Sequence, residues 1–285
     1  MYAAISADVV SSTSLSRESM IELNEKLKKC LSILERRYQG FWGRIVRGDF
    51  IECIMSQPED AFEVALILKT WVKSFEPSDA HDAKRFNRYG LRIAIGIGEM
   101  KTIDRALDMM DGDAIYRSGR AISKLVGRAK YSFTISMANS EHEQALQVIS
   151  TLVNQLLNNA TARKCETLCE RILTSDTSKT AEKMGISVSG VNQTLKDLGW
   201  SGIEQAIIYY RKITSNSCFN SYRCSHFWRF LFTMALFLQK QNPIFCKRKG
   251  FVVTFFDNRN AIMDSHLGFK RMVACPVYND ITFSD

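Results

Sequence analysis

The sequence predicts an α/β protein of the α+β type, with a sheet-containing first part and a small all-helical second part. Short apolar runs typical of strands alternate with amphipathic stretches as far as residue 136, and helical periodicity dominates from there to residue 213. The order strand, helix, strand, strand, helix, strand, helix, strand indicates a ferredoxin-like palm with extra elements. We therefore expect a palm over residues 1–138, a helical part over 139–213 and a tail without assigned function over 214–285.

Composition sets broad limits on function. The 285 residues are 46% hydrophobic, which is enough for two modest domains with their own cores. The net charge of +8 is spread along the chain, so it permits nucleotide or nucleic-acid partners without implying them. The eight cysteines are scattered, and Cys165 and Cys169 lack a second Cys or His pair nearby, which favours free thiols over zinc ligands.

The same features predict a cytoplasmic location. Free cysteines suit a reducing compartment. The N-terminus leads directly into strand-like sequence, so we expect no signal peptide. We also expect no transmembrane span, because the apolar block at residues 226–238 is too short to cross a bilayer.

The first predicted strand ends near a carboxylate. An apolar run over residues 3–10 carries Asp8, and a small polar loop with Ser11, Ser12 and Thr13 follows it. Backbone N–H groups of such a loop, beside the N-terminus of the next helix, bind phosphate readily. We therefore expect a phosphate-binding rim here.

A helix and a hairpin come next. Apolar residues recur on one helical face from about Arg17 to Tyr38, and Ser16 suits the N-cap of this helix. Residues 43–55 then form two strands joined by a tight turn at Gly48 and Asp49. The turn places the Asp49 carboxylate at the tip of the hairpin.

Topology predicts that the two carboxylates meet. With a right-handed crossover, the first strand lies antiparallel beside the second hairpin strand, so Asp8 and Asp49 share one rim. Two carboxylates suit Mg²⁺ or Mn²⁺, which takes its other ligands from phosphate and water. The alternative is that Asp8 caps the next segment and Asp49 is only a turn former.

The rest of the palm contains a second helix that opens at residues 57–60, an exposed polar connection over 76–87 and a strong strand over 89–100. Gly96 and Gly98 strip side chains from one face of this strand. Such bare backbone allows close approach of a packed helix or of a ligand.

An acidic loop at residues 104–111 leads to a third helix beginning at Gly112, and the last strand is predicted over residues 131–136. Arg117 and Arg120 stand near the head of that helix. Their guanidinium groups could pair with phosphate. The alternative is that they belong to a solvated helix face.

A helix-turn-helix is predicted at about residues 177–200. Ala181 is small enough for two helices to cross, Gly185 suits the turn, and Ser187 suits the cap of the second helix, in which Val191 packs inward.

If this motif binds DNA, polar side chains of its second helix would face the major groove, and Lys196 would contact phosphate. The groove-facing residues would be Ser187, Ser189, Gln193 and Thr194. The alternative is a packing unit only, since this helix carries few basic residues. Paired half-sites in DNA would favour a homodimer.

Motifs in the palm carry a resemblance to known families. Asp8-Val9-Val10-Ser11-Ser12, Gly48-Asp49, Leu91 to Glu99 and Gly112 to Arg120 occur in the order found in the catalytic domain of class III nucleotidyl cyclases. The chain more closely resembles the bacterial SatD family, in its I-x-x-D-[IV]-V-x-S start, G-D-x-F hairpin, glycine-rich strand and D-G-x-A-[FY] helix start. This resemblance covers roughly residues 1–213.

The resemblance implies a cyclase-like palm joined to a helix-turn-helix. In the cyclases two aspartates hold two metal ions, and an Asn and an Arg stabilise the ribose and the transferring phosphate. Asp8 and Asp49 match the metal positions and Arg120 matches the Arg. Tyr116 replaces the Asn, and Ile45 replaces the base-reading Lys. Cyclase sites form between two protomers, so the resemblance also implies a homodimer.

Three functions therefore remain open. The first is a cytoplasmic regulatory protein that couples a nucleotide- and metal-binding palm to a DNA-binding helix-turn-helix. The second is an active cyclase that forms a cyclic nucleotide from a nucleoside triphosphate, with Arg120 as a catalytic residue. The third is a non-catalytic interaction scaffold.

Overall fold

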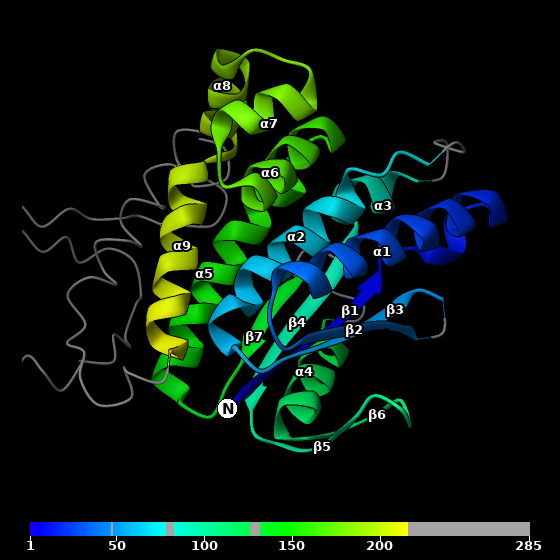
Figure 1. The fold of residues 1–285 in the computed structure, drawn as a ribbon, viewed down its shortest axis with the longest axis vertical. Coiled ribbons are helices and arrows are strands. Elements are labelled where there is room, and N and C mark those ends of the chain that lie inside the picture. Colours follow the sequence, from blue (N-terminus) through cyan, green and yellow to red (C-terminus); the bar gives the residue numbers. More distant parts are fainter. Residues whose placement is uncertain (47, 78–82, 126–131, 216–285) are drawn as a thin grey trace, which may run out of the picture. The chain divides into compact units, whose positions relative to one another are not determined.

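The computed structural model describes residues 1–46, 48–77, 83–125 and 132–215 (Figure 1). These residues belong to one compact unit, Met1–Lys240. The predicted tail over 214–285 lies outside the described residues apart from its first two positions, as do Arg47 and the start of the predicted last strand.

A five-stranded mixed sheet forms the centre of the fold, which confirms the predicted α+β class. The strand order is β2-β3-β1-β4-β7, and every neighbouring pair is antiparallel except β4 and β7, which are parallel. The first four strands therefore have the ferredoxin-like order. The strands are β1 (Tyr2–Val9), β2 (Phe41–Val46), β3 (Phe50–Met55), β4 (Leu91–Gly98) and β7 (Phe133–Ser136).

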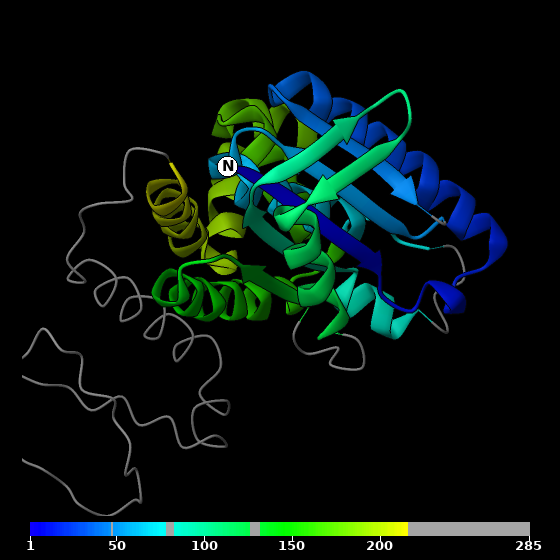
Figure 2. The ribbon, with the colours of Figure 1, turned by 90° about the horizontal axis from the view of Figure 1, so that it is seen from below.

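Helices cover both faces of this sheet (Figures 1 and 2). α1 (Arg17–Arg37) and α2 (Ala61–Lys73) pack on one face, where Ile5 and alternate residues of β1 enter the main core. α4 (Asp113–Ser123) packs on the other face, where Ala4 contacts Ala114. Because side chains alternate along a strand, Asp8 lies on the same face as Ala4 and α4.

The bare stretch of β4 accommodates a helix. A Cβ atom at Gly96 would lie 2.2 Å from the Ala114 carbonyl oxygen and 2.4 Å from the Ser118 backbone nitrogen. Ser118 also forms a buried hydrogen bond of 2.8 Å with Ser6 of β1. Of the two occupants predicted for this face, the packed helix is the one that the structure shows at Gly96.

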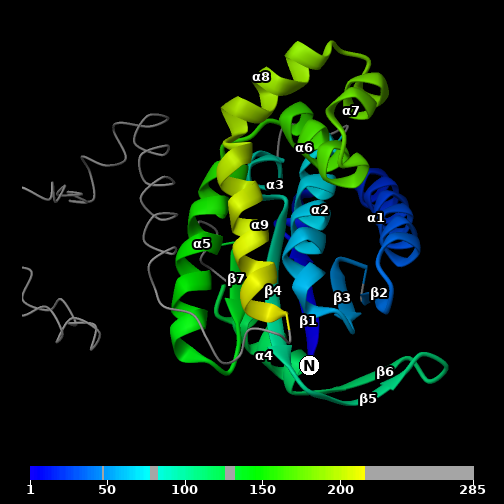
Figure 3. The ribbon, with the colours of Figure 1, turned by 60° about the vertical axis from the view of Figure 1, so that its left-hand side comes forward.

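Two segments differ from the sequence-based prediction. The acidic loop at 104–111 is largely a hairpin of β5 (Met100–Asp104) and β6 (Met109–Gly112), which extends from the start of α4 (Figure 3). Arg44 of β2 pairs with Asp108 over 2.8 Å and holds the hairpin tip. The connection predicted over 76–87 includes the start of a short helix, α3 (Lys84–Tyr89), because Phe86 and Tyr89 are buried.

The helical part continues the palm core. Its helices are α5 (Ser140–Asn158), α6 (Ala162–Thr174), α7 (Thr177–Met184), α8 (Val188–Leu198) and α9 (Trp200–Thr214), and short 3₁₀ turns occur earlier at η1 (Ser12–Ser14) and η2 (Pro58–Asp60). The continuous helix predicted from Glu141 breaks at Thr161, whose side chain caps α6.

One aromatic stack crosses the predicted boundary at residue 138. The ring of Phe62 in α2 lies 5.4 Å from the ring of Phe133 in β7 and 5.4 Å from that of Tyr210 in α9. The same buried cluster includes residues of α1, α2, α5, α6 and α9. Palm and helical part therefore share one core.

No helix in the described part of the chain combines the length and the apolar character that crossing a bilayer requires.

Candidate functional site

Asp8 and Asp49 lie together at one end of the sheet. Asp8 is near the end of β1, where it is opposite Phe50 of β3. Asp49 directly precedes β3, and its carbonyl oxygen accepts a hydrogen bond of 3.1 Å from the Val9 nitrogen. The antiparallel pairing of β1 with β3 therefore brings the two predicted metal ligands to one rim.

The loop after β1 supplies a hydroxyl to this rim. Ser12 Oγ donates a hydrogen bond of 2.7 Å to Asp49 Oδ2. Ser11 has a left-handed backbone conformation, with φ at 57°, which turns the chain into η1. Thr13 is exposed, whereas Ser11 and Ser12 are half-buried. The structure thus joins Ser12 directly to the acidic pair and places its two neighbours in the same turn.

The rim also contains a cation that the sequence analysis did not select. Arg92 of β4 is opposite Asp8, and its Nη2 atom lies 2.9 Å from Asp8 Oδ2. Both side chains are largely shielded from solvent, with 17% and 22% exposed. The missed signal was a cross-strand pair of opposite charges, which becomes visible once the register of β1 and β4 is known.

Two polar atoms in this pair have no hydrogen-bond partner among the described residues. They are Asp8 Oδ1 and Arg92 Nε, and both are buried. Burial raises the pKa of Asp8 and the Asp49 charge adds to that rise, whereas Arg92 opposes it. An oxygen left without a partner beside a second carboxylate is a position that a cation would stabilise.

The chemistry of these donors fits a hard divalent cation. Mg²⁺ typically takes one or two protein carboxylates and completes its shell with phosphate and water. Asp8 and Asp49 would hold it, and Ser12 orients Asp49. Within the described residues no group of three or more His, Cys, Asp or Glu side chains has a metal-binding arrangement. Two carboxylates would leave the rest of the shell to phosphate and water.

The predicted phosphate-binding arginines lie elsewhere. Arg117 pairs with Asp113 one turn earlier, with 2.6 Å between Nε and Oδ2. The Arg120 guanidinium lies 5.9 Å from the centre of the Tyr116 ring. Both arginines line a cavity of about 750 Å³ between α4, β7 and α5, and neither aspartate lines that cavity. Among the described residues, the contacts within one chain place Arg120 beside Tyr116 and this cavity, and none of them joins it to Asp8 or Asp49.

The helix-turn-helix contains the predicted structural features. Gly185 has a left-handed conformation between α7 and α8, and Ser187 Oγ caps α8 by accepting a hydrogen bond of 3.1 Å from the Gly190 nitrogen. Ala181 and Val191 are buried. These contacts account for the angle between the two helices without reference to DNA.

The residues selected for DNA contact lie mainly on the outer surface of α8. Ser187, Ser189, Gln193 and Lys196 are exposed, whereas Thr194 is half-buried. Ser187 Oγ lies 3.0 Å from Ser189 Oγ, and Gln193 donates a hydrogen bond of 2.8 Å to Asp197. Two exposed apolar residues that were not predicted as part of this surface, Ile186 and Val188, adjoin it.

Comparison with known proteins gives limited results. The chain matches no protein-family model, and no curated protein matches it. One solved structure, of a bacterial light-regulated adenylyl cyclase, matches with 15% sequence identity and a TM-score of 0.34, over 47% of this chain and 74% of that chain. A likeness at this TM-score does not establish a shared function.

Proposed function

We propose that this chain is a regulatory protein of the SatD type, with a cyclase-like palm that binds a nucleoside triphosphate and a divalent cation. The observation that carries this proposal is the juxtaposition of Asp8, Asp49 and Ser12 at one rim. The second function that we propose is DNA binding through α7 and α8.

The rim residues have distinct roles in this proposal. Asp8 and Asp49 hold Mg²⁺ or Mn²⁺, and Ser12 keeps the Asp49 carboxylate in place. When bound, the cation neutralises phosphate charge. Ser11 and Thr13 supply hydroxyl and backbone donors for phosphate oxygens, and Ser12, whose hydroxyl proton is donated to Asp49, supplies its backbone N–H. Arg92 fixes Asp8 from the other side and limits its motion.

Active cyclisation has less support than binding. It would require Arg120 at the transferring phosphate, yet Arg120 faces the cavity beside α5. Tyr116, at the position of the cyclase Asn, bonds to Asp111. A homodimer that brings Arg120 of a second copy to the rim would be needed, and we retain the homodimer as part of the proposal.

The nucleotide proposal is tested by thermal melting of the full chain with each nucleoside triphosphate and Mn²⁺. A ligand that binds only the native state, at a concentration of about one hundred times its Kd, raises the free energy of unfolding by about 2.7 kcal/mol. We expect one nucleotide to raise the Tm only when Mn²⁺ is present, and we expect Asp8→Asn and Asp49→Asn to abolish that rise. A rise that persists in both variants would show that the nucleotide binds elsewhere.

The DNA proposal is tested by fluorescence anisotropy with a pool of double-stranded fragments at several salt concentrations. We expect Lys196→Ala to weaken binding. It should also reduce the slope of the logarithm of the binding constant against the logarithm of the salt concentration by about one. Gln193→Ala should reduce discrimination between fragments. Lys101→Ala removes the same charge from β5, which is outside the helix-turn-helix. It should change neither the affinity for DNA nor its salt dependence.

A further inference from the structure

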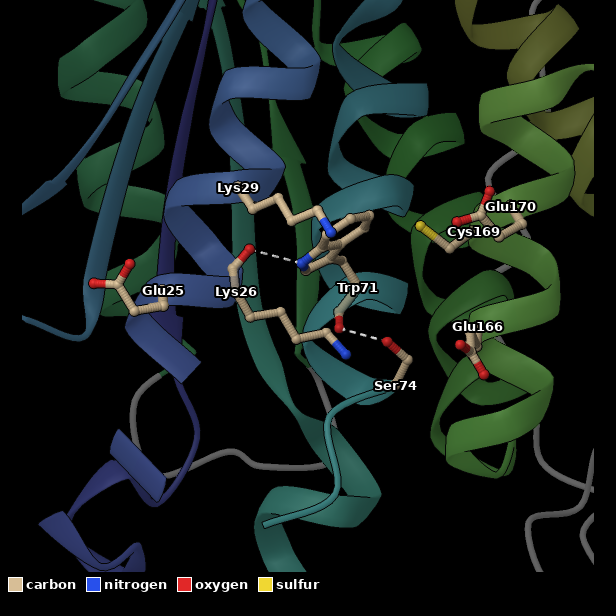
Figure 4. A pocket seen from close by; sticks show the side chains of 8 residues that line it. All are labelled: Glu25, Lys26, Lys29, Trp71, Ser74, Glu166, Cys169 and Glu170. Carbon is tan, nitrogen blue, oxygen red and sulfur yellow. Dashed lines mark hydrogen bonds between the residues drawn. The ribbon is translucent and has the colours of Figure 1, made fainter. Parts of the chain in front are cut away.

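A cavity between the palm helices and α6 has no role in the proposed function. Its volume is about 630 Å³, within the range of sites that hold small ligands. Its walls come from α1, α2 and α6, and Figure 4 shows their side chains. The lining residues are Glu25, Lys26, Lys29, Trp71, Ser74, Glu166, Cys169 and Glu170.

One wall of the cavity is a fixed aromatic ring. Trp71 Nε1 donates a hydrogen bond of 2.8 Å to the Lys26 carbonyl oxygen, which ties α2 to α1. Ser74 Oγ in turn donates 2.8 Å to the Trp71 carbonyl oxygen. The indole is half-buried, and Cys169 faces the same space from α6 (Figure 4). A flat apolar group could therefore pack here without displacing the ring.

The acidic side chains of the lining already have cationic partners outside it. Glu25 pairs with Lys28 and Glu166 pairs with Arg163, each over 2.8 Å. Glu170 pairs with Lys183 of α7 over 2.9 Å. None of these three cations lines the cavity.

The two lysines of the lining are in the opposite situation. Neither Lys26 nor Lys29 has an ion pair with any described residue, although Glu166 is close enough to favour the charged form of Lys26. Burial lowers the pKa of Lys26, and the Lys29 charge adds to this effect. The Lys26 ammonium lies 5.9 Å from the centre of the Phe75 ring, which is a weak substitute for an anion.

We propose that this cavity binds a small molecule with a flat aromatic part and one carboxylate or phosphate group. The aromatic part would lie against Trp71, and the anionic group would lie between Lys26 and Lys29. An anion there relieves the repulsion between two neighbouring ammonium groups, one of them half-buried. The occupant would contact the palm and also α6, whose Glu170 is paired with the first helix of the helix-turn-helix.

The probe for this proposal is 2-naphthoate, titrated into the full chain by isothermal calorimetry. Its neutral counterpart, 2-naphthalenemethanol, has the same ring system without the charge. We expect the naphthoate to bind at least about tenfold more tightly than the alcohol. The double variant Lys26→Gln, Lys29→Gln should remove this preference, and Trp71→Ala should weaken both compounds.

Two controls make the result specific. Lys101→Gln removes one positive charge from an exposed residue that neither lines the cavity nor pairs with its carboxylates, and it should leave the naphthoate affinity unchanged within about twofold. Asp49→Asn should also leave it unchanged, which separates this cavity from the proposed nucleotide site. Absence of naphthoate binding, equal loss in Lys101→Gln, or unaltered binding in the double lysine variant would each overturn the proposal.

Discussion

Arg92 and Asp8 form a cross-strand ion pair, with 2.9 Å between Arg92 Nη2 and Asp8 Oδ2. The pair stands at the rim where Asp49 also lies, so Asp8 has a cation on one side and a second carboxylate near the other. Its remaining oxygen is buried and has no hydrogen-bond partner in the part of the chain that the structure describes. Asp8 is therefore placed at an electrostatic cost that a bound cation would reduce.

The first prediction concerns Asp8→Asn in the absence of metal. The amide removes a largely buried charge and its repulsion with Asp49, while its oxygen can still accept a hydrogen bond from Arg92. We expect the free energy of unfolding at neutral pH to change by less than about 1 kcal/mol, as measured by urea denaturation. A loss of several kcal/mol would assign Asp8 a structural role instead.

The same variant has a predicted pH signature. Because the pKa of Asp8 is raised in the folded protein, its protonated form favours folding. That contribution is fully present below the unfolded-state pKa and is lost as the pH rises through the folded-state pKa. Asp8→Asn should remove this part of the pH dependence. Plots of the free energy of unfolding against pH for the native sequence and the variant should therefore differ most in slope across the mildly acidic range.

Arg92→Gln should behave differently. It leaves the Asp8 carboxylate largely buried without its cation, and we expect a loss of about 1–3 kcal/mol at neutral pH. Because protonation of Asp8 removes the unpaired charge, the difference from the native sequence should shrink in acid. Urea titrations at neutral and acidic pH measure both effects. A pH-independent loss would indicate that Arg92 contributes by packing alone.

Two glycines of the α4 region provide a matched comparison. A Cβ at Gly96 would collide with the backbone at Ala114 and Ser118, so Gly96→Ala should lose about 1–3 kcal/mol. At Gly119, within α4 itself, a Cβ meets nothing within 4 Å. Gly119→Ala should therefore gain about 0.5–1 kcal/mol by restricting the unfolded chain. Equal effects at both positions would contradict the packing of α4 on β4.

Local patterns predicted much of this architecture. The helix caps at Ser16 and Ser187 and the turns at Gly48 and Gly185 depend on residues close in sequence, and the structure confirms these elements. The position of Asp8 and Asp49 at one rim followed from two general rules. These are the right-handed crossover between strands and the antiparallel order of the hairpin.

Long-range pairings could not be predicted in the same way. The contact of Arg92 with Asp8 depends on the exact register of β1 against β4. The contact that holds the tip of the β5-β6 hairpin comes from Arg44, which is more than sixty residues from Asp108 in sequence. Neither partner is identified by a local pattern, because many charged residues would suit either position equally well.

Lys69 provides a prediction about a buried charge in the core. It has no solvent exposure, and its Nζ donates to the carbonyl oxygens of Tyr89 and Leu91 and to Ser132 Oγ, at 3.0, 2.7 and 2.9 Å. Lys69→Met leaves these acceptors without their donor, and we expect a loss of about 2–4 kcal/mol in urea denaturation. Lys28→Met, on the exposed face of α1, should stay within about 0.5 kcal/mol of the native sequence.

The pH dependence of this variant has a defined sign. Burial is the main cause that lowers the pKa of Lys69, and Lys73 adds to it. The unfolded chain therefore binds more protons between the folded-state and unfolded-state pKa values, and stability rises with pH across that window. Lys69→Met should remove this rise, which ends near the unfolded-state pKa of about 10. An identical slope in the variant would show that Lys69 does not titrate in this range.

Two buried tyrosines differ in whether their hydroxyl group has a partner. Tyr38 donates a hydrogen bond to Glu63, whereas the Tyr210 hydroxyl has no partner among the described residues. Tyr38→Phe should lose about 1–3 kcal/mol, because a largely buried carboxylate loses a donor. Tyr210→Phe keeps the ring stacked on Phe62 and removes an unsatisfied group, so its stability should be unchanged or up to about 1 kcal/mol higher. Urea denaturation of both variants decides the matter: a clear loss in Tyr210→Phe would mean that the hydroxyl has a partner beyond the described residues.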